Sequence, residues 1–333
     1  MQVRRRRYAN PAGGSDAPVD DLIDVAHNGV SLAVREFCCR IGCDSGSFSR
    51  AAANLERVGQ IKLSDETLRK LVESQGRAVL ACQEDGQLEL DFDAGQCRTD
   101  QTGGGGVQSR VYVGIDGFML PMVTDLEMGR RFEKARARRK RLKRKKGVRR
   151  PPLVRRRGSD QRYKEFKLVT MYDQAQERKL MRVTRHGPDR AARMLRGMAE
   201  DVGLWRADQV VAVTDGAPWI AGLIERNLPR EKTTAIVDFY HAAEHVHQAR
   251  RAMYGQENEA GGTWAGQVIE AMLNGSFERW WELLVQARLR LRSPAKRKAL
   301  DGLMQYLLSR KHKLDYARFK AMGLKIGSGP TES

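Results

Sequence analysis

Two apolar runs that each end in an aspartate constrain the fold of this 333-residue chain most strongly. One run, V-Y-V-G-I, leads into Asp116, and the other, V-V-A-V-T, leads into Asp215; a glycine follows each aspartate. Short apolar runs closed by turn residues predict buried β-strands. Ligand sites in open α/β sheets lie beyond the carboxyl ends of the strands. If the two strands are neighbours, both carboxylates meet at one edge of a sheet; otherwise each Asp-Gly is an ordinary turn.

The remaining apolar segments complete an α/β pattern and then give way to helices. The strand-like stretches are 166–172, 179–184 and 235–237, and the helical ones are 188–203 and 218–227. Residues 173–178 form a hairpin loop between the first two of these strands. Nearly everything from Tyr240 to about Tyr316 is helical. This order predicts a mixed α/β sheet with right-handed crossovers and an all-helical insertion.

Changes in composition predict the division into domains. Residues 1–20 form a basic lead-in without fixed structure, and residues 21–102 form a helical domain. Four glycines at 103–106 make a flexible joint. The α/β core follows at 107–239, and the helical insertion occupies 240–316.

The N-terminal domain contains the outline of a helix-turn-helix. A helix around Phe48 to Val58 is followed by a short break and a second helix that begins at Ser64, a good N-cap residue. Asp65 and Glu66 occupy the first turn of this second helix, where phosphates or bases would be met. DNA binding by this unit therefore stays open.

The net charge of +19 is concentrated in one stretch of the core, the basic loop 130–157. This stretch holds 17 Lys and Arg against one acidic residue, Glu133. Concentrated positive charge favours a polyanion partner, most often nucleic acid, although a solvated basic loop without a partner is the alternative. The tract from Lys134 to Lys146 is also compatible with one basic helix that orders against DNA. Its expected DNA contacts are Arg138, Arg139, Lys140, Arg141, Lys143, Arg144, Lys145 and Lys146.

Composition argues against several other classes of protein. No stretch has 18 consecutive apolar residues, so no membrane partner is expected, and no apolar core follows the basic N-terminus as in a secretory signal. The five cysteines include no C-x-x-C pair, which disfavours a disulfide framework or a zinc ribbon. Cys38, Cys39 and Cys43 are either buried apolar residues of a helix or, together with His27, metal ligands.

The aspartates at the strand ends predict metal chemistry. Like charges held close together need a cation, and ligands that are all oxygen suit Mg²⁺ or Mn²⁺. Two such ions about 3.5–4 Å apart are the usual arrangement for in-line displacement at phosphorus.

Three further segments carry a resemblance to a known family. They are D-G-A-P-W-I from Asp215, D-F-Y-H-A from Asp238, and I-G-S-G-P-T-E-S from Ile326 to Ser333. In this order, they resemble segments of the DDE transposases of bacterial insertion sequences, in a Mutator-like group. The resemblance extends from about Val111 to Ser333.

This resemblance implies a ribonuclease-H-like core and a site for two Mg²⁺ or Mn²⁺ ions held by Asp116, Asp215 and Glu332. It implies that Asp238 and His241 lie behind these ligands or position the scissile strand. The partners would be transposon-end and target DNA, bound by at least a homodimer in the bacterial cytoplasm at the nucleoid. Residues 317–333 would begin the core's last segment, and the helical insertion would help to hold the transposon ends.

The position of Glu332 raises a question about activity. The third acidic residue of this fold projects from a helix packed on the sheet, and one residue, Ser333, follows Glu332. The expectation is therefore a chain cut short at its C-terminus.

Three other functions remain open. A truncated transposase derivative can bind DNA and regulate without chemistry, and a ribonuclease-H-like nuclease would use the same aspartates. The segment from His241 to His245 also matches H-x-x-E-H, a zinc protease motif in which Glu244 is the base and Glu270 or Glu278 a further ligand. Zinc content separates this last interpretation from the others.

Overall fold

The computed structural model describes residues 8–9, 11, 15–16, 30–88, 90–99, 108–122, 124–143 and 162–332. It divides into two compact units, Met1–Glu89 and Leu90–Ser333.

The first unit is built on three helices around a small core. They are α2 (Leu32–Asp44), α3 (Phe48–Gly59) and α4 (Asp65–Glu84). Cys38, Ala51, Leu55 and Leu68 form the core, so Cys38 has the apolar role; Cys43 is exposed, and His27 lies outside the described residues. Gln60 ends α3 in the left-handed conformation, with φ of 54°, and Ser64 caps α4. Two short strands, β1 (Tyr8–Ala9) and β2 (Ser15–Asp16), pair within the segment expected to lack fixed structure.

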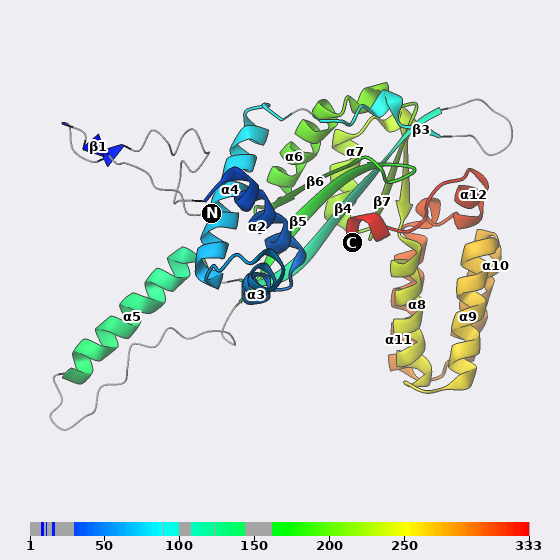
Figure 1. Ribbon diagram of the computed structural model, residues 1–333. Helices are drawn as coiled ribbons and strands as arrows, with labels where there is room; N and C mark the ends of the chain where they lie inside the picture. The colour runs from blue at the N-terminus through cyan, green and yellow to red at the C-terminus, as the bar shows by residue number, and fades with distance from the viewer. Residues whose placement is uncertain are drawn as a thin grey trace. The chain divides into compact units, whose positions relative to one another are not determined.

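The second unit is organised around a six-stranded mixed sheet in the order β6-β5-β4-β7-β8, with β3 paired to β4 (Figure 1). Its strands are β3 (Arg98–Thr99), β4 (Gln108–Met122), β5 (Arg162–Asp173), β6 (Lys179–Thr184), β7 (Gln209–Thr214) and β8 (Thr233–Val237). The β5 strand is antiparallel to β4 and β6, whereas β7 is parallel to β4 and β8. The predicted mixed α/β sheet is confirmed.

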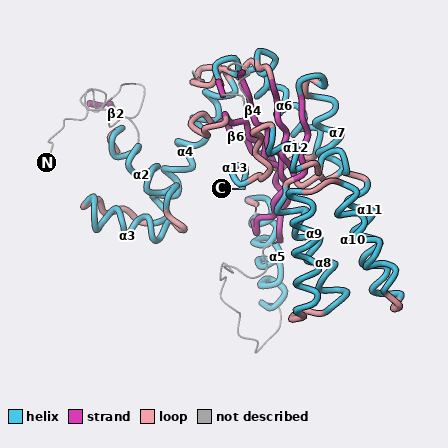
Figure 2. The backbone as a smooth tube through the Cα atoms, turned by 90° about the vertical axis from the view of Figure 1, so that its right-hand side faces the viewer, coloured by secondary structure: helices cyan, strands magenta, loops and turns pink. Residues whose placement is uncertain are grey.

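The two faces of the sheet are covered by different helices, because successive side chains of a strand point to opposite faces. Val111, Val113 and Ile115 pack against α6 (Pro188–Asp201) and α7 (Pro218–Asn227). Tyr112 and Val213 belong to the opposite core, which the helical insertion covers. Figure 2 shows the long helices of the insertion lying together beside the strands.

The helical insertion contains four long helices and two short ones. They are α8 (Phe239–Tyr254), α9 (Glu259–Asn274), α10 (Phe277–Arg290), α11 (Pro294–Leu308), η4 (Lys311–Lys313) and α12 (Tyr316–Ala321). Trp264, Trp280, Leu284, Leu303 and Leu307 are buried in its core. The chain then crosses back to the sheet and forms α13 (Gly329–Glu332).

One boundary differs from the expected one. The compact units divide after Glu89 rather than at glycines 103–106, which lie outside the described residues. Phe92, Ala94 and Cys97 are buried in the core of the second unit, so this stretch packs with the sheet that follows it. The basic loop begins as a helix, α5 (Asp125–Lys143), which agrees with the alternative of one basic helix.

Candidate functional site

Asp116 and Asp215 occupy matching positions of the neighbouring parallel strands β4 and β7. Asp215 directly follows the end of β7, whereas β4 continues past Asp116 to Met122, so the expectation of a strand that ends at Asp116 is wrong. In the register of β4 and β7, Ile115 pairs with Thr214, and the two aspartates are the next residues of these strands. Tyr112 and Gly114 precede Asp116 at alternate positions, so Asp116 falls on the face of the sheet that carries the insertion. The strands are neighbours, which is the condition for two converging carboxylates.

A glycine follows each aspartate, but the turn follows Asp215 alone, because Gly117 continues β4 in its pairing with β5. The Asp116 carboxylate accepts a hydrogen bond from Gly117 N at 2.6 Å, and the Asp215 carboxylate accepts one from Ala217 N at 2.8 Å. Gly216 has φ of +76°, a conformation that L side chains rarely adopt. Pro218 then begins α7, where its fixed φ suits the first helical turn and its missing N–H is no loss. The D-G-A-P sequence therefore makes a tight strand-to-helix turn.

The segment that carries Glu332 crosses the same face of the sheet. Helix α13 contacts β4 and β5, and Thr331 is buried against them. A Cβ on Gly114 would lie 1.9 Å from Thr331 Oγ1, so only glycine allows this approach. Gly114 lies two residues before Asp116, which places the backbone of Glu332 near the part of β4 that holds Asp116.

Asp238 anchors the start of this segment. Its carboxylate is 3% exposed, caps α8 by accepting a bond from His241 N at 2.8 Å, and accepts bonds from both the backbone N–H and the hydroxyl of Ser328. Phe239 N also donates to Ile326 O at 2.9 Å. The D-F-Y-H-A and G-S-G-P-T-E-S segments are therefore in direct contact. The Asp238 carboxylate therefore holds two backbone segments of the protein: the first turn of α8 and the segment that leads to Glu332.

A second anchor, which the sequence analysis missed, lies upstream on the same segment. Arg110, buried at the start of β4, donates from Nη1 to Gly323 O at 3.1 Å. The Tyr112 hydroxyl accepts a bond from Lys325 N at 3.1 Å, and burial raises the pKa of this tyrosine. An arginine and a tyrosine in an apolar strand carry no sequence signal for this role, because their partners are backbone groups more than 200 residues away.

His241 and His245 lie one turn apart on α8 and contact each other edge to face, with ring centroids 5.0 Å apart. The His245 ring also packs on Tyr306 at 4.0 Å, and the Tyr306 hydroxyl donates to Asp215 O at 3.4 Å. Burial, followed by His241 and Arg310, lowers the pKa of His245, while Glu244 and Asp215 act in the opposite direction. His245 thus packs between α8 and α11, next to the turn that carries Asp215.

The carboxylates fit a hard divalent cation better than zinc. Asp116 and Asp215 offer oxygen ligands from matching positions of adjacent strands, the donor type that Mg²⁺ and Mn²⁺ prefer. Among the described residues, no three His, Cys, Asp or Glu side chains gather in a way that could hold a metal ion, and the side chain of Glu332 is outside that set. Asp116 and Asp215 would supply two of the three expected ligands.

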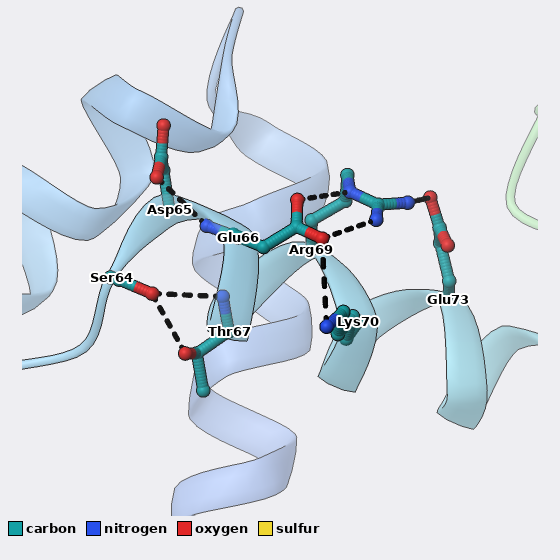
Figure 3. A network of polar contacts seen from close by, with 7 residues as sticks. All are labelled: Ser64, Asp65, Glu66, Thr67, Arg69, Lys70 and Glu73. Atoms are coloured by element: carbon teal, nitrogen blue, oxygen red, sulfur yellow. Dashed lines mark hydrogen bonds and ion pairs between the residues drawn. The ribbon is translucent and has the colours of Figure 1, made fainter. Parts of the chain in front are cut away.

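The first turn of α4 carries a network of charged side chains in the first unit (Figure 3). Arg69 bonds to Glu66 at 2.8 Å and to Glu73 at 2.5 Å, and Lys70 lies 3.7 Å from Glu66. The hydrogen bonds from Arg69 lower the pKa of Glu66. Glu66, one of the two acidic residues at the start of α4, is therefore matched by cations of its own helix.

The described part of the basic segment is an exposed helix. Glu127, in its first turn, pairs with Lys164 of β5 at 2.6 Å, and this hydrogen bond lowers the pKa of Glu127 to about 2. Arg138, Lys140 and Arg141 are exposed, and Arg139 is half-buried. Lys143 is the last residue of α5, whereas Arg144, Lys145 and Lys146 lie outside the described residues.

None of the helices in the described ranges is both long enough and apolar enough to span a bilayer. No family model and no curated protein matches the chain. A solved structure described as the Drosophila P element transposase strand transfer complex is similar at 14% sequence identity, with a TM-score of 0.31. The match covers 92% of this chain and 64% of the P element transposase chain. This chain therefore spans less than two thirds of the length of that transposase chain. The fold assignment rests on the strand order and directions of the sheet.

Proposed function

We propose that this chain is a DNA transposase of an insertion sequence, which cleaves DNA and joins the released 3′ end to a target by means of Asp116, Asp215 and Glu332. The observation that supports this most directly is the register of β4 and β7, which sets the two aspartates side by side. The turn of α13 adds the backbone of a third acidic residue to the same face.

Each acidic residue of the site would have its own role. Asp116 and Asp215 would bind the cations, and the hydrogen bonds from Gly117 and Ala217 would keep one oxygen of each carboxylate oriented. When bound, two Mg²⁺ or Mn²⁺ ions would activate the attacking water or 3′-hydroxyl and stabilise the leaving oxygen. Asp238 would keep the segment of Glu332 on the sheet through Ser328.

The basic helix supports a DNA substrate. The cations of α5 and the residues that follow would neutralise backbone phosphates, which releases counterions and supplies affinity without sequence specificity. Holding two transposon ends would require at least a homodimer on DNA. A bacterial chain of this kind would act in the cytoplasm at the nucleoid.

Cleavage and joining assays on the full chain would test this proposal. The substrate is a supercoiled plasmid that carries the DNA flanking the coding sequence, with Mg²⁺ or Mn²⁺ and with EDTA. Asp116→Asn, Asp215→Asn and Glu332→Gln should each lower nicking and joining by at least about a hundredfold, since each removes a metal ligand. The matched control is Glu244→Gln, which neutralises an exposed carboxylate on α8 and should leave both activities unchanged.

Other outcomes identify the alternatives. If the wild type binds DNA without metal but does not nick it, the chain is a DNA-binding derivative, and the proposal that it is an enzyme is overturned. Nicking of hybrid or branched DNA without joining would indicate a nuclease. Bound zinc, together with peptide cleavage lost in Glu244→Gln, would indicate the H-x-x-E-H protease.

A further inference from the structure

Arg310 lies beside the turn that carries Asp215, although the two residues are far apart in the sequence. It follows the end of α11 and donates from Nε to Gly216 O at 3.0 Å. Its Nη1 donates to Tyr306 O at 3.1 Å and to Ser309 Oγ at 2.8 Å. A Cβ on Gly216 would come within 3.0 Å of Arg310 Nε, so this glycine leaves room for the guanidinium.

The guanidinium is held in one orientation. It lies over the Tyr306 ring, with the central carbon 4.2 Å from the ring centroid. The Tyr306 ring packs on His245 and its hydroxyl reaches Asp215 O, so the ring is itself braced between α8 and the turn. A planar cation fixed by stacking and by carbonyl acceptors loses little further entropy when it binds a ligand.

The charge of Arg310 has no carboxylate partner among the described residues. Its hydrogen bonds there go to two backbone carbonyls and one hydroxyl, and they use Nε and Nη1. The N–H groups of Nη2 make no hydrogen bond to this part of the chain. Two other half-buried arginines of the second unit do have carboxylate partners: Arg182 pairs with Asp201 and Arg288 with Asp301.

We propose that Arg310 binds a DNA phosphate next to the edge formed by Asp116 and Asp215. A rigid guanidinium with unused N–H groups matches the oxygens of a phosphodiester, and such charge-assisted bonds are the strong ones. This inference rests on the proposed function for its ligand and adds a contact that the sequence motifs do not include. Arg310 is thus a substrate-binding residue supplied by the helical insertion.

Binding measurements in EDTA would test this contact independently of metal and of cleavage. The probes are short labelled duplexes taken from the DNA that flanks the coding sequence, measured by fluorescence anisotropy. Arg310→Gln should weaken binding about tenfold and lower the slope of log affinity against log salt by about one. The matched control, Arg318→Gln, removes the same charge from an exposed position on α12 and should weaken binding less than twofold.

A methylphosphonate scan would locate the phosphate. In the wild type and in Arg318→Gln, neutralising one particular phosphate should weaken binding about tenfold. In Arg310→Gln, that same replacement should have no further effect, because the contact is already lost. Arg310→Lys keeps the positive charge but lacks the planar guanidinium, so its affinity for DNA should lie between those of the wild type and Arg310→Gln. Thermal unfolding should show that every variant is folded.

Failure of this inference and failure of the proposed function are distinguishable. The inference is overturned if Arg310→Gln and Arg318→Gln bind the duplexes with the same affinity. It is also overturned if every methylphosphonate replacement weakens binding by the same factor in Arg310→Gln as in the wild type. In either case Arg310 only braces the Gly216 turn. If the wild type binds but never cleaves with metal, the transposase proposal fails while the Arg310 contact is still measured. If the wild type does not bind these duplexes, the inference is wrong.

Discussion

The hydroxyl oxygens of Thr331 and Thr170 lie 2.9 Å apart, across the position on β4 that Gly114 occupies. Both threonines are buried, so their hydroxyls satisfy each other, and Thr170 also reaches Gly114 O at 3.4 Å. The missing side chain of Gly114 thus provides the space in which the segment of Glu332 sits. This contact ties that segment to β5, the strand that pairs with the strand of Asp116.

Gly114→Ala is expected to displace this segment. The new methyl group would overlap Thr331 Oγ1 and would lie 2.5 Å from Thr170 Oγ1, so α13 must move. Overpacking of this kind costs about 1–3 kcal/mol, and metal-dependent DNA cleavage should fall by more than the loss of folded protein explains. Thermal unfolding and the cleavage assay measure the two effects.

The control for this variant is Gly302→Ala, on α11, where a Cβ meets nothing within 4 Å. An exposed helical glycine replaced by alanine should stabilise the protein by about 0.5–1 kcal/mol and leave cleavage unchanged. Full cleavage activity in Gly114→Ala would show that α13 need not rest on β4.

Ser328→Ala should destabilise the second unit. Its hydroxyl donates to Asp238 at 2.7 Å, and removing the donor leaves a buried carboxylate with one bond fewer. The expected loss of unfolding free energy is about 1–3 kcal/mol by chemical denaturation. Ser293→Ala, at an N-cap without a side-chain bond, is the control and should change stability by no more than about 0.5 kcal/mol. Equal effects of the two variants would contradict the anchoring role of Asp238.

Protonation of His245 should destabilise the protein at mildly acidic pH. Burial holds its pKa in the folded chain below the ordinary value of about 6.5, so the unfolded chain takes up the proton first as the pH falls. The free energy of unfolding should therefore fall with pH from about 6.5 down to the folded pKa. His245→Gln should show a shallower fall over this window, while His312→Gln, at an exposed position, should behave as the parent. Identical slopes in all three proteins would show that burial of His245 has no such effect.

The basic segment should set the salt dependence of DNA binding. Replacing Arg138, Arg139, Lys140, Arg141, Lys143, Arg144, Lys145 and Lys146 by Gln should lower the salt slope by up to roughly seven, if every cation meets a phosphate. Anisotropy titrations at several salt concentrations give this slope. In the control, Lys296, Arg297 and Lys298 on α11 are replaced by Gln. This control measures how much the salt slope falls for each positive charge that is removed outside the basic segment. A slope that stays at the parent value in the first variant would rule out phosphate contacts by the segment.

The strands of the sheet were predictable because each is a short apolar run in the sequence, and turn residues bound most of these runs. The run before Asp215 ends at a turn that glycine and proline specify, and α7 begins where Pro218 indicates. Parallel pairing of β4 with β7 was needed to bring the aspartates together, and the α/β order of segments already favoured it.

The contacts among distant segments were not predictable in the same way. Nothing local shows that Ser328 meets Asp238, that Arg110 reaches Gly323, or that Arg310 reaches Gly216. Each of these bonds joins a side chain to a partner brought close only by the folded insertion. The position of the unit boundary was not predicted for a similar reason, because Phe92 and Cys97 pack with residues of strands that follow the glycines in the sequence.

The anchors on the segment of Glu332 have a consequence for the rate of folding. Asp238 and Ser328 are separated by 90 residues, and Arg110 and Gly323 by 213, so closing these loops from an extended chain is entropically costly. The α-hairpins between Asp238 and Ser328 form from local contacts and bring the two ends of the insertion together. We expect the insertion to fold first and to shorten the loops that remain, so that variants which loosen its helices slow the docking of α13 without touching it.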